Sequence, residues 1–326
     1  MIVITENAAR RLVDPSDAID AVEFAFKEVA RHQVLNFPIV RERLVPSPDV
    51  YGIKSGVATG ANILGLKIGG YWNSNIARKL TNHQSTTVLS DPATGRPIAL
   101  VASNYLTGLR TAAACALAIK HLARADATIL GLIGTGAQSL FHLELACMAR
   151  PFKHVFFNSL HPEHAADLLA WCVHMNIDAK FDNAETVARN ADVLITLTPS
   201  KTPIVKHDWI RPGTHICAMG ADTAGKQELE IAIMAGARVY VDDWKQASTI
   251  GESQSAVRAG LLDEASIAGS LCNVVAGSLL GRQTRQEVTV FDSTGMAIQD
   301  LAIAHRAYET ARHEPSEGVY VIDLLG

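Results

Sequence analysis

The stretch from Thr128 to Ser139 constrains the fold of this chain more than any other. It reads T-I-L-G-L-I-G-T-G-A-Q-S, in which an apolar, strand-like run reaches Gly134-Thr-Gly136 and a helix-like segment follows. In such a turn the first glycine permits a tight bend, the second lets the backbone approach a pyrophosphate, and the helix offers N–H groups to the phosphates. The layout predicts a dinucleotide-binding turn in an α/β fold. The alternative is a glycine-rich turn that holds no ligand.

The turn begins near residue 128 of 326, so more than a hundred residues precede it. A chain of this length fits two domains. Strand candidates alternate with helical stretches such as 161–175, which is typical of βαβ units and a parallel sheet. These candidates are 128–133, 154–158, 192–197, 214–219 and 238–242.

The residues before the turn follow a different pattern. Asp14-Pro15 is a typical helix start, and the spacing of Ile19, Val22 and Phe26 predicts an amphipathic helix over 15–32. The pattern from 38 to 101 is β-like. An alanine-rich helix is predicted over 106–123, and a second helix over 296–312.

Composition and charge exclude several classes of protein. Hydrophobic residues make up 48% of the chain and charged residues 19%, which is typical of a globular protein. The net charge of −4 argues against a nucleic-acid binder. No apolar run approaches the ~18 residues of a membrane span, and M-I-V-I-T-E-N does not resemble a secretory signal. The five cysteines are scattered without C-x-x-C spacing, so we expect reduced thiols in a cytoplasmic protein.

Two departures from the dinucleotide pattern bear on the choice of cofactor. Ser139 stands where a third glycine or alanine is usual, and Asn158 stands at the end of the next strand, where an acid usually binds the ribose hydroxyls. Asparagine can bind a ribose but does not repel a 2′-phosphate, and no arginine stands beside it to hold that phosphate. The sequence favours NAD, and NADP stays open.

Asp222 is a candidate acid at the carboxyl end of a strand. The stretch Gly220-Ala-Asp-Thr-Ala-Gly225-Lys226 matches the phosphate loop of nucleotide triphosphatases, but Gln227 replaces the Ser or Thr that would hold magnesium. We therefore reject that function. Ligands bind beyond the carboxyl ends of strands in open α/β sheets, so Asp222 is either a site acid or a turn and cap residue.

Basic residues interrupt apolar stretches in the first part of the chain. Lys54 and Lys67 lie in strand-like runs, Arg110 opens the alanine-rich helix, and Arg41 lies in an earlier strand. Because an unpaired buried ammonium is costly, these side chains either reach solvent or face an anion. Arginine suits bidentate capture of a carboxylate. Together they predict a cationic pocket for a small carboxylate substrate.

Other catalytic patterns are weak. His161-Pro-Glu-His164 lacks a third ligand nearby, so we expect a solvated surface and no metal site. The chain has no G-x-S-x-G nucleophile elbow.

Several stretches together resemble the ornithine cyclodeaminase/mu-crystallin family, over nearly the whole chain. They are L-T-G-L-R-T-A-A-A-C-A-L-A (106–118), the G-T-G-A-Q turn, G-A-D-x-x-G-K-Q-E-L (220–229) and V-T-V-F-D-S-T-G-x-A-I-Q-D (288–300). The resemblance implies a homodimer whose subunit combines a Rossmann NAD-binding domain with a second α/β domain for substrate binding and dimerisation. It places the Rossmann domain at 119–295 and the second domain at 1–118 and 296–326.

The resemblance also implies roles for individual residues. Arg41, Lys67 and Arg110 should bind the substrate carboxylate, and Asp222, together with Lys67, should be catalytic, with Asp222 as the acid/base near the imine nitrogen. Thr294 is expected at the substrate. The residues expected at the cofactor are Arg110, Thr111, Gly134, Gly136, Ala137, Gln138, Asn158, Thr198, Met219, Lys226 and Ser293.

Members of the family exchange a hydride between a nicotinamide and an amino-acid or imine carbon. Here Gln84 replaces an apolar substrate contact of the cyclodeaminases, and the stretches 36–42, 69–72 and 82–86 look most like members that reduce iminosuccinate. A polar His83/Gln84 pair with Lys54 could bind a second carboxylate. We expect NADH-dependent reduction of iminosuccinate to L-aspartate. Alanine dehydrogenase and cyclic ketimine reductase remain open, and ornithine cyclodeaminase or a non-catalytic crystallin-type binding protein are less favoured.

Overall fold

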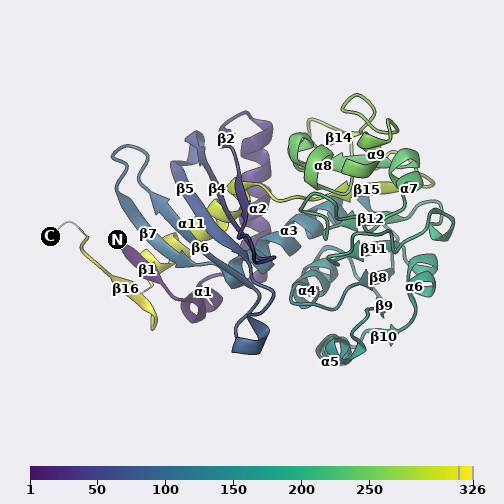
Figure 1. Cartoon of the computed structure of the whole chain (residues 1–326), viewed down its shortest axis with the longest axis horizontal. Coiled ribbons are helices and arrows are strands. Elements are labelled where there is room, and N and C mark those ends of the chain that lie inside the picture. Colours follow the sequence, from purple (N-terminus) through teal and green to yellow (C-terminus); the bar gives the residue numbers. More distant parts are fainter. Residues whose placement is uncertain (315, 325–326) are drawn as a thin grey trace. The chain divides into compact units, whose positions relative to one another are not determined.

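The computed structural model describes residues 1–314 and 316–324. The chain divides into two compact units, one made of Met1–Arg110 with Met296–Gly326 and the other of Thr111–Gly295 (Figure 1). We call them the split unit and the central unit. The helix α3 (Asn104–Leu122) contains the boundary between them.

The central unit is built on one parallel sheet with strand order β10-β9-β8-β11-β12-β15-β13-β14. Its strands are β8 (Ile129–Ile133), β9 (His154–Asn158), β10 (Asp178–Phe181), β11 (Val193–Thr196), β12 (His215–Ala218), β13 (Arg238–Val241), β14 (Gly269–Ser270) and β15 (Thr289–Asp292). The inner strands β11 and β12 are mostly apolar and buried throughout, as expected of a parallel sheet that is covered on both faces. β8 lies between β9 and β11, where the strand order reverses, which is the Rossmann arrangement.

Short helices connect these strands, and the core lies between them and the sheet. They are α4 (Ser139–Ala149), α5 (Ala166–His174), α6 (Ala184–Asn190), α7 (Ile231–Gly236), α8 (Trp244–Ile250), α9 (Gln254–Arg258) and α10 (Leu271–Val275). The single helix predicted over 161–175 is a 3-10 turn at Pro162–Ala165 followed by α5. The strand β10 is not predicted, because D-A-K-F is only four residues long and lies at the sheet edge without an apolar run.

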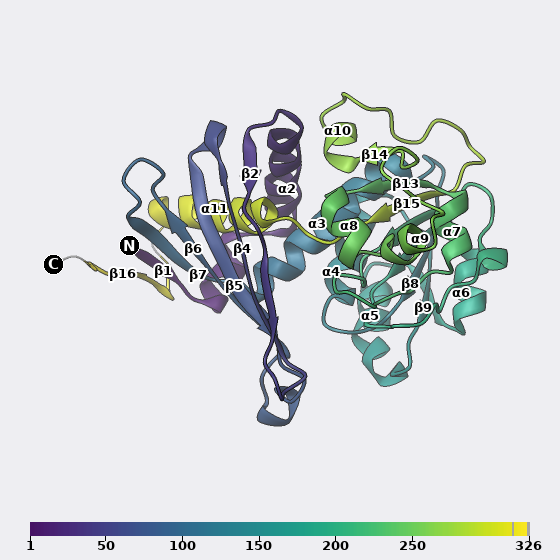
Figure 2. The same cartoon turned by 45° about the horizontal axis from the view of Figure 1, so that its top comes forward.

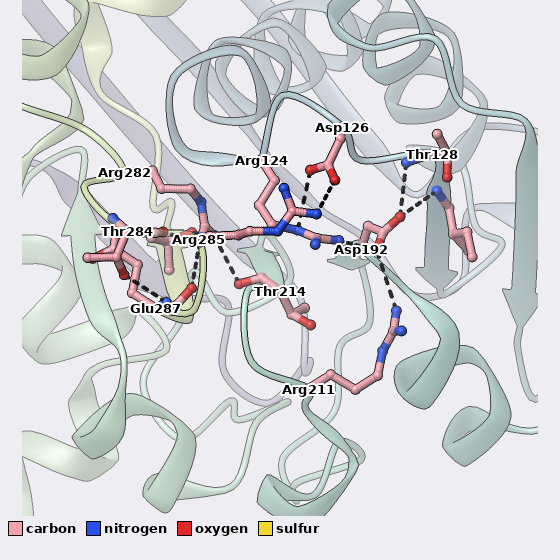
Figure 3. Close-up of polar contacts among 12 residues, drawn as sticks. Arg124, Asp126, Thr128, Asp192, Arg211, Thr214, Arg282, Thr284, Arg285 and Glu287 are labelled. Atoms are coloured by element: carbon pink, nitrogen blue, oxygen red, sulfur yellow. Dashed lines mark hydrogen bonds and ion pairs between the residues drawn. The ribbon is translucent and has the colours of Figure 1, made fainter.

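The amino edge of this sheet is held by arginines and carboxylates (Figure 3). Asp192, just before β11, accepts hydrogen bonds from the backbone N–H of Thr128 at 2.9 Å and from Arg124 Nη2 at 2.6 Å. Arg282 donates to the carbonyl oxygens of Leu122 and Thr214. These contacts pair backbone groups that the sheet ladder and the carboxyl end of α3 leave open, so we assign them to the fold.

The split unit is built on a mixed sheet with strand order β16-β1-β7-β6-β5-β4-β2, to which β3 is added beside β4. Its strands are β1 (Ile2–Ile4), β2 (Val34–Asn36), β3 (Val40–Arg43), β4 (Val50–Ala58), β5 (Ile63–Tyr71), β6 (His83–Ser90), β7 (Pro97–Ala102) and β16 (Val319–Val321). All neighbours are antiparallel except β1 and β7. The short strands β1 and β16 are not predicted from the sequence, since each depends on pairing with a distant segment.

Helices α1 (Glu6–Leu12), α2 (Pro15–Ala30) and α11 (Ala297–His313) belong to the same unit. α2 begins as predicted, with Asp14 as N-cap and Pro15 in the first turn. α11 packs on β4, β5 and β6 and against α2 (Figures 1 and 2). Gly65 permits this close packing, because a Cβ there would lie 3.1 Å from Leu301 Cδ2 and 2.3 Å from the carbonyl oxygen of Val88. None of the described helices has the length and hydropathy needed to cross a membrane.

Candidate functional site

The cofactor residues expected from the sequence in the central unit lie mostly at one edge of its sheet. The register pairs Ile133 with Asn158 and with Thr196, and Ala218 with Thr196 and with Asp292, so these strands end level. Gly134, Gly136, Ala137 and Gln138 follow β8, Asn158 ends β9, Thr198 follows β11, Met219 and Lys226 follow β12, and Ser293 follows β15. The carboxyl edge beside the strand-order reversal is where such sheets bind ligands. Thr111, by contrast, lies on α3.

The turn after β8 has the backbone that a pyrophosphate needs. Gly134 has φ +106°, and a Cβ there would lie 2.9 Å from the carbonyl oxygen of Leu197, so only glycine fits. Gly136 is exposed, and a Cβ there would meet no atom within 4 Å. α4 begins at Ser139 without a side-chain cap from Gln138. An open glycine and an uncapped helix start suit a phosphate group, so the residues present fit a dinucleotide.

Asn158 lies beside this turn. Its carbonyl oxygen accepts a hydrogen bond from the N–H of Gly134 at 2.8 Å, and its side-chain Nδ2 donates to the carbonyl oxygen of Asp182 at 2.9 Å. The side chain is half-buried. It therefore stands at the strand end where a ribose partner is expected, and its contact with a ribose remains a prediction.

Asp222 and Lys226 form one ion pair in the loop after β12. Asp222 Oδ1 accepts hydrogen bonds from Lys226 Nζ at 2.7 Å and from Thr223 Oγ1 at 3.0 Å. Lys226 Nζ also donates to the carbonyl oxygen of Gly220 at 3.2 Å. The Asp222 side chain is 42% exposed, so a substrate can reach it. The structure thus brings together two residues that the sequence places at the catalytic and cofactor positions.

Four buried acids connect the loops at the carboxyl edge. Glu228 accepts hydrogen bonds from the N–H groups of Thr198 and Gly220, and Glu252 accepts from the N–H groups of Glu228 and Leu229. Asp292 accepts from the N–H groups of Glu252 and Ser253. Asp242 accepts from the N–H groups of Thr294 and Gly295 and from the Ser293 and Thr294 hydroxyls. Each loop is held by the acid of another, so the loops that carry Thr198, Ser293 and Thr294 form one connected set.

Burial and mutual repulsion act on these acids. Burial raises the pKa of Glu228 and, together with the charge of Glu228, raises the pKa of Glu252 well above its usual value. Burial, opposed by hydrogen bonds from Ser253 and aided by the charge of Asp242, raises the pKa of Asp292 from 3.8 to about 7. The set is therefore sensitive to pH near neutrality.

The split unit contains a buried cluster of opposite charges. Asp300, in the first turn of α11, accepts hydrogen bonds on Oδ1 from Lys67 Nζ at 2.8 Å and from Arg110 Nε at 2.9 Å. Lys67 also donates to Thr107 Oγ1 at 3.3 Å. The side chains of Lys67, Arg110 and Asp300 are 8%, 9% and 2% exposed. Burial opposes ionisation of Asp300, but Arg110, Lys67 and Lys54 outweigh it and lower the pKa of this carboxyl from 3.8 to about 2.

Strand register extends this positive surface. Lys54 on β4 is paired directly with Lys67 on β5, so both side chains lie on one face of the sheet. Arg41 is paired with Gly52, which is two residues from Lys54, so Arg41 lies on the same face. Gly52 is paired in turn with Gly69, and neither has a side chain. Neither glycine therefore places a side chain between Arg41 and the two lysines.

His83 and Gln84 do not form the pair that the sequence suggests. His83 is paired with Tyr71 and Gln84 with Gly70, so the two side chains point to opposite faces of β6. His83 shares the face of Lys67, whereas Gln84 Nε2 donates to the carbonyl oxygen of Thr81 at 2.8 Å. Strand alternation in H-Q-S-T-T could have separated them. Of the two, only His83 lies on the positive face.

Sequence reasoning also missed the acids. Asp300 ends the stretch 288–300, where no local pattern marks it as a site residue, whereas Asp242 and Asp292 end apolar strand-like runs, which is the signal that could have identified them. No cluster of three or more His, Cys, Asp or Glu side chains within the described residues is arranged to hold a metal ion. His161 and Glu163 form an exposed pair at 3.2 Å instead.

Comparisons with known proteins agree with this architecture. Over 96% of this chain and 98% of the relative, the sequence is 42% identical to the iminosuccinate reductase of Paracoccus denitrificans. The structure of that enzyme in complex with NAD+ superposes with a TM-score of 0.91, covering 96% of this chain and 97% of that one. The alanine dehydrogenase of Archaeoglobus fulgidus is 35% identical over 95% of each chain.

Two further solved structures are similar over nearly the whole chain. An archaeal alanine dehydrogenase dimer with bound NAD gives a TM-score of 0.93 at 33% identity and covers 99% of this chain and 100% of that one. The Δ1-pyrroline-2-carboxylate reductase of Thermococcus litoralis, in complex with NADH and L-proline, gives 0.92 at 28% identity and covers 96% and 98%.

The family model of these proteins matches residues 3–314. The match includes the glycine turn, the buried cations and both units. The chain therefore belongs to the ornithine cyclodeaminase/mu-crystallin family.

Proposed function

We propose that this protein reduces iminosuccinate to L-aspartate with NADH. The chain is an NAD(P)-dependent oxidoreductase of its family, and the proposal concerns its substrate. The observation that carries it is the positive face of the split unit, where Lys54 and Lys67 are paired across two strands and Asp300 accepts hydrogen bonds from Lys67 and Arg110. Arg41, Lys54 and Lys67 lie on this one face, and these cations would offer partners to two substrate carboxylates.

In this proposal each group of residues has a role. Lys67 and Arg110 would bind the α-carboxylate, and Lys54 with Arg41 would bind the second. The turn at Gly134–Gln138 would hold the pyrophosphate, and Asn158 the ribose, of a bound nicotinamide dinucleotide, which supplies the hydride. Asp222 would keep the imine nitrogen protonated, which makes its carbon more electrophilic, and would accept that proton in the reverse direction.

A substrate panel tests the choice of substrate. The purified protein would be given NADH with oxaloacetate and ammonia, with pyruvate and ammonia, or with Δ1-pyrroline-2-carboxylate, and NADH oxidation would be followed. The proposal expects the highest kcat/KM with oxaloacetate and ammonia. A higher value with pyruvate would identify an alanine dehydrogenase, and one with the cyclic imine a ketimine reductase. Either result would overturn the proposed substrate.

The variant Asp222→Asn tests the acid/base role. Because the side chain is exposed and lies in a loop, the free energy of unfolding should change little, while kcat should fall about 100-fold or more. Asp208→Asn is the matched control, since Asp208 is also exposed and contacts only surface groups such as Arg189. Unchanged turnover in Asp222→Asn would refute the role.

We further infer that the protein acts as a homodimer. Val45, Ile76 and Leu80 are 85%, 70% and 53% exposed in the adjoining loops between β3 and β4 and between β5 and β6, which project from the sheet of the split unit in Figure 2. Large exposed apolar groups in one region are typical of an interface, and the archaeal relative is a dimer. Sedimentation velocity should give twice the mass of the chain for the wild type. It should give the monomer for Val45→Lys/Ile76→Lys, and a monomeric wild type would contradict the inference.

A further inference from the structure

Asp300 has an arrangement that the needs of the fold do not explain. Its Oδ1 serves both Lys67 and Arg110, while its Oδ2 is buried and makes no hydrogen bond within the described part of the chain. A buried acceptor without a donor is destabilising. Packed apolar side chains at these positions would stabilise a sheet and helix as well or better.

The cations around Asp300 add a second cost. Lys54 and Lys67 are paired directly across β4 and β5, and like charges at such positions repel each other. Arg110 approaches the same carboxylate from α3. The cations that act on Asp300 are thus Lys54, Lys67 and Arg110, from β4, β5 and α3, and Thr107 accepts a hydrogen bond from Lys67. Asp300 is thus a buried carboxylate placed among three cations.

The backbone of α11 fixes Asp300 in place. The helix begins after Met296, whose N–H donates to Gln299 Oε1 at 2.7 Å, and Asp300 follows in the first turn. Negative charge is favourable there because of the helix dipole. Asp300 therefore approaches Lys67 from a rigid element that is far away in the sequence.

We propose that Asp300 is a positioning residue for the substrate site: it directs Lys67 and Arg110 toward one point and favours the charged form of Lys67, so that they bind the α-carboxylate of the substrate. The inference rests on the proposed function only in assigning that carboxylate to Lys67 and Arg110. Asp300 itself does not touch the substrate. It acts through the two cations, by holding one donor of each and by offsetting the repulsion among Lys54, Lys67 and Arg110.

The main test is Asp300→Asn in the full-length enzyme. Without the negative charge, Lys67 would lose its proton at lower pH, because two cations remain beside it. KM for the imino acid should rise at least about tenfold, and the alkaline limb of kcat/KM against pH should move down by about one unit. Asp300→Glu, which keeps the charge, should restore the position of that limb while KM stays raised. Asp17→Asn, which removes a surface acid paired with Arg306 on the same unit, is the control.

A measurement without substrate separates this inference from the proposed function. Protein labelled with ¹⁵N at lysine Nζ is titrated by NMR, with Lys67→Arg identifying the Lys67 resonance. The resonance should titrate at lower pH in Asp300→Asn than in the wild type, whichever imine the enzyme reduces. If the wild type prefers another imino acid, the kinetic arm is run with that substrate.

Two outcomes would overturn the role of Asp300. One is an unchanged KM together with an unchanged Lys67 titration in Asp300→Asn. The other is a loss of activity with neither the alkaline limb nor the Lys67 titration moved, which would make Asp300 merely structural. If Asp300→Asn does not fold, Asp300→Glu decides: a KM raised at least threefold supports the role, and an unchanged KM refutes it.

Discussion

Two glycines in one turn allow the fold and the cofactor site to be perturbed separately. Gly134 has φ +106°, and a Cβ there would lie 2.9 Å from a backbone oxygen. Gly134→Ala should therefore lower the free energy of unfolding by about 2 kcal/mol or more, since an unsuitable backbone conformation alone costs about 1–3 kcal/mol. In Gly136→Ala the added methyl group meets no atom of the protein within 4 Å, so stability should change by less than about 1 kcal/mol.

The effect on cofactor binding should be the reverse of the effect on stability. The methyl group of Gly136→Ala would occupy the space where the backbone approaches a pyrophosphate. Kd for NADH should rise at least about tenfold, which corresponds to about 1.4 kcal/mol. Urea unfolding gives the stabilities, and NADH fluorescence titration gives the affinities. If Gly136→Ala binds NADH as tightly as the wild type, the turn does not hold the pyrophosphate and the reasoning fails.

Three further predictions concern other parts of the central unit. Asn158→Asp should increase the preference for NADH over NADPH, measured as a ratio of kcat/KM, by about tenfold because a carboxylate repels the 2′-phosphate; an unchanged ratio would remove Asn158 from the ribose site. Asp192→Asn weakens contacts to Arg124 and to the Thr128 backbone, so it should lower the free energy of unfolding by about 2–4 kcal/mol. Kd for NADH should be unchanged in the folded variant, and a changed Kd would contradict a purely structural role of Asp192. The pKa of Asp292 is raised from 3.8 to about 7 in the folded protein, so between these values the folded state keeps a proton that the unfolded state releases. The stability that this carboxyl contributes is therefore full below about pH 4 and is lost as pH rises to 7. Urea unfolding of the wild type should show a loss of about 3 kcal/mol between pH 5 and 8 from this group, and Asp292→Asn should flatten that slope; an equal slope in both proteins would be evidence against it.

The sequence predicts those parts of the fold that depend on local pattern. The buried strands of the central unit appear as apolar runs, and α2 begins at Asp14-Pro15 because the cap and the proline act within one turn. β1 and β16 escape prediction, because each has only three residues and exists through pairing with a partner far along the chain. The edge strand β10 also escapes prediction, because its four residues D-A-K-F contain no apolar run like those of the inner strands of the same sheet.

Residues of the candidate site can be predicted from the sequence where a charged residue interrupts an apolar stretch. Lys67 and Arg110 stand out because a cation in an apolar stretch needs a partner. The partner itself is invisible, since Asp300 lies 233 residues from Lys67 and looks like an ordinary acid in the first turn of a helix. Only the folded structure joins them.

The four buried acids of the carboxyl edge bind mainly main-chain N–H groups of the loops that they connect. Main-chain groups are the same for every residue type except proline, so the loops are held largely independently of the side chains they present. The loops bearing Thr198 and Met219 can therefore accept new side chains without losing their path. Side chains at this edge, and with them the contacts to a cofactor, could therefore be redesigned while Glu228, Glu252, Asp292 and Asp242 are left intact.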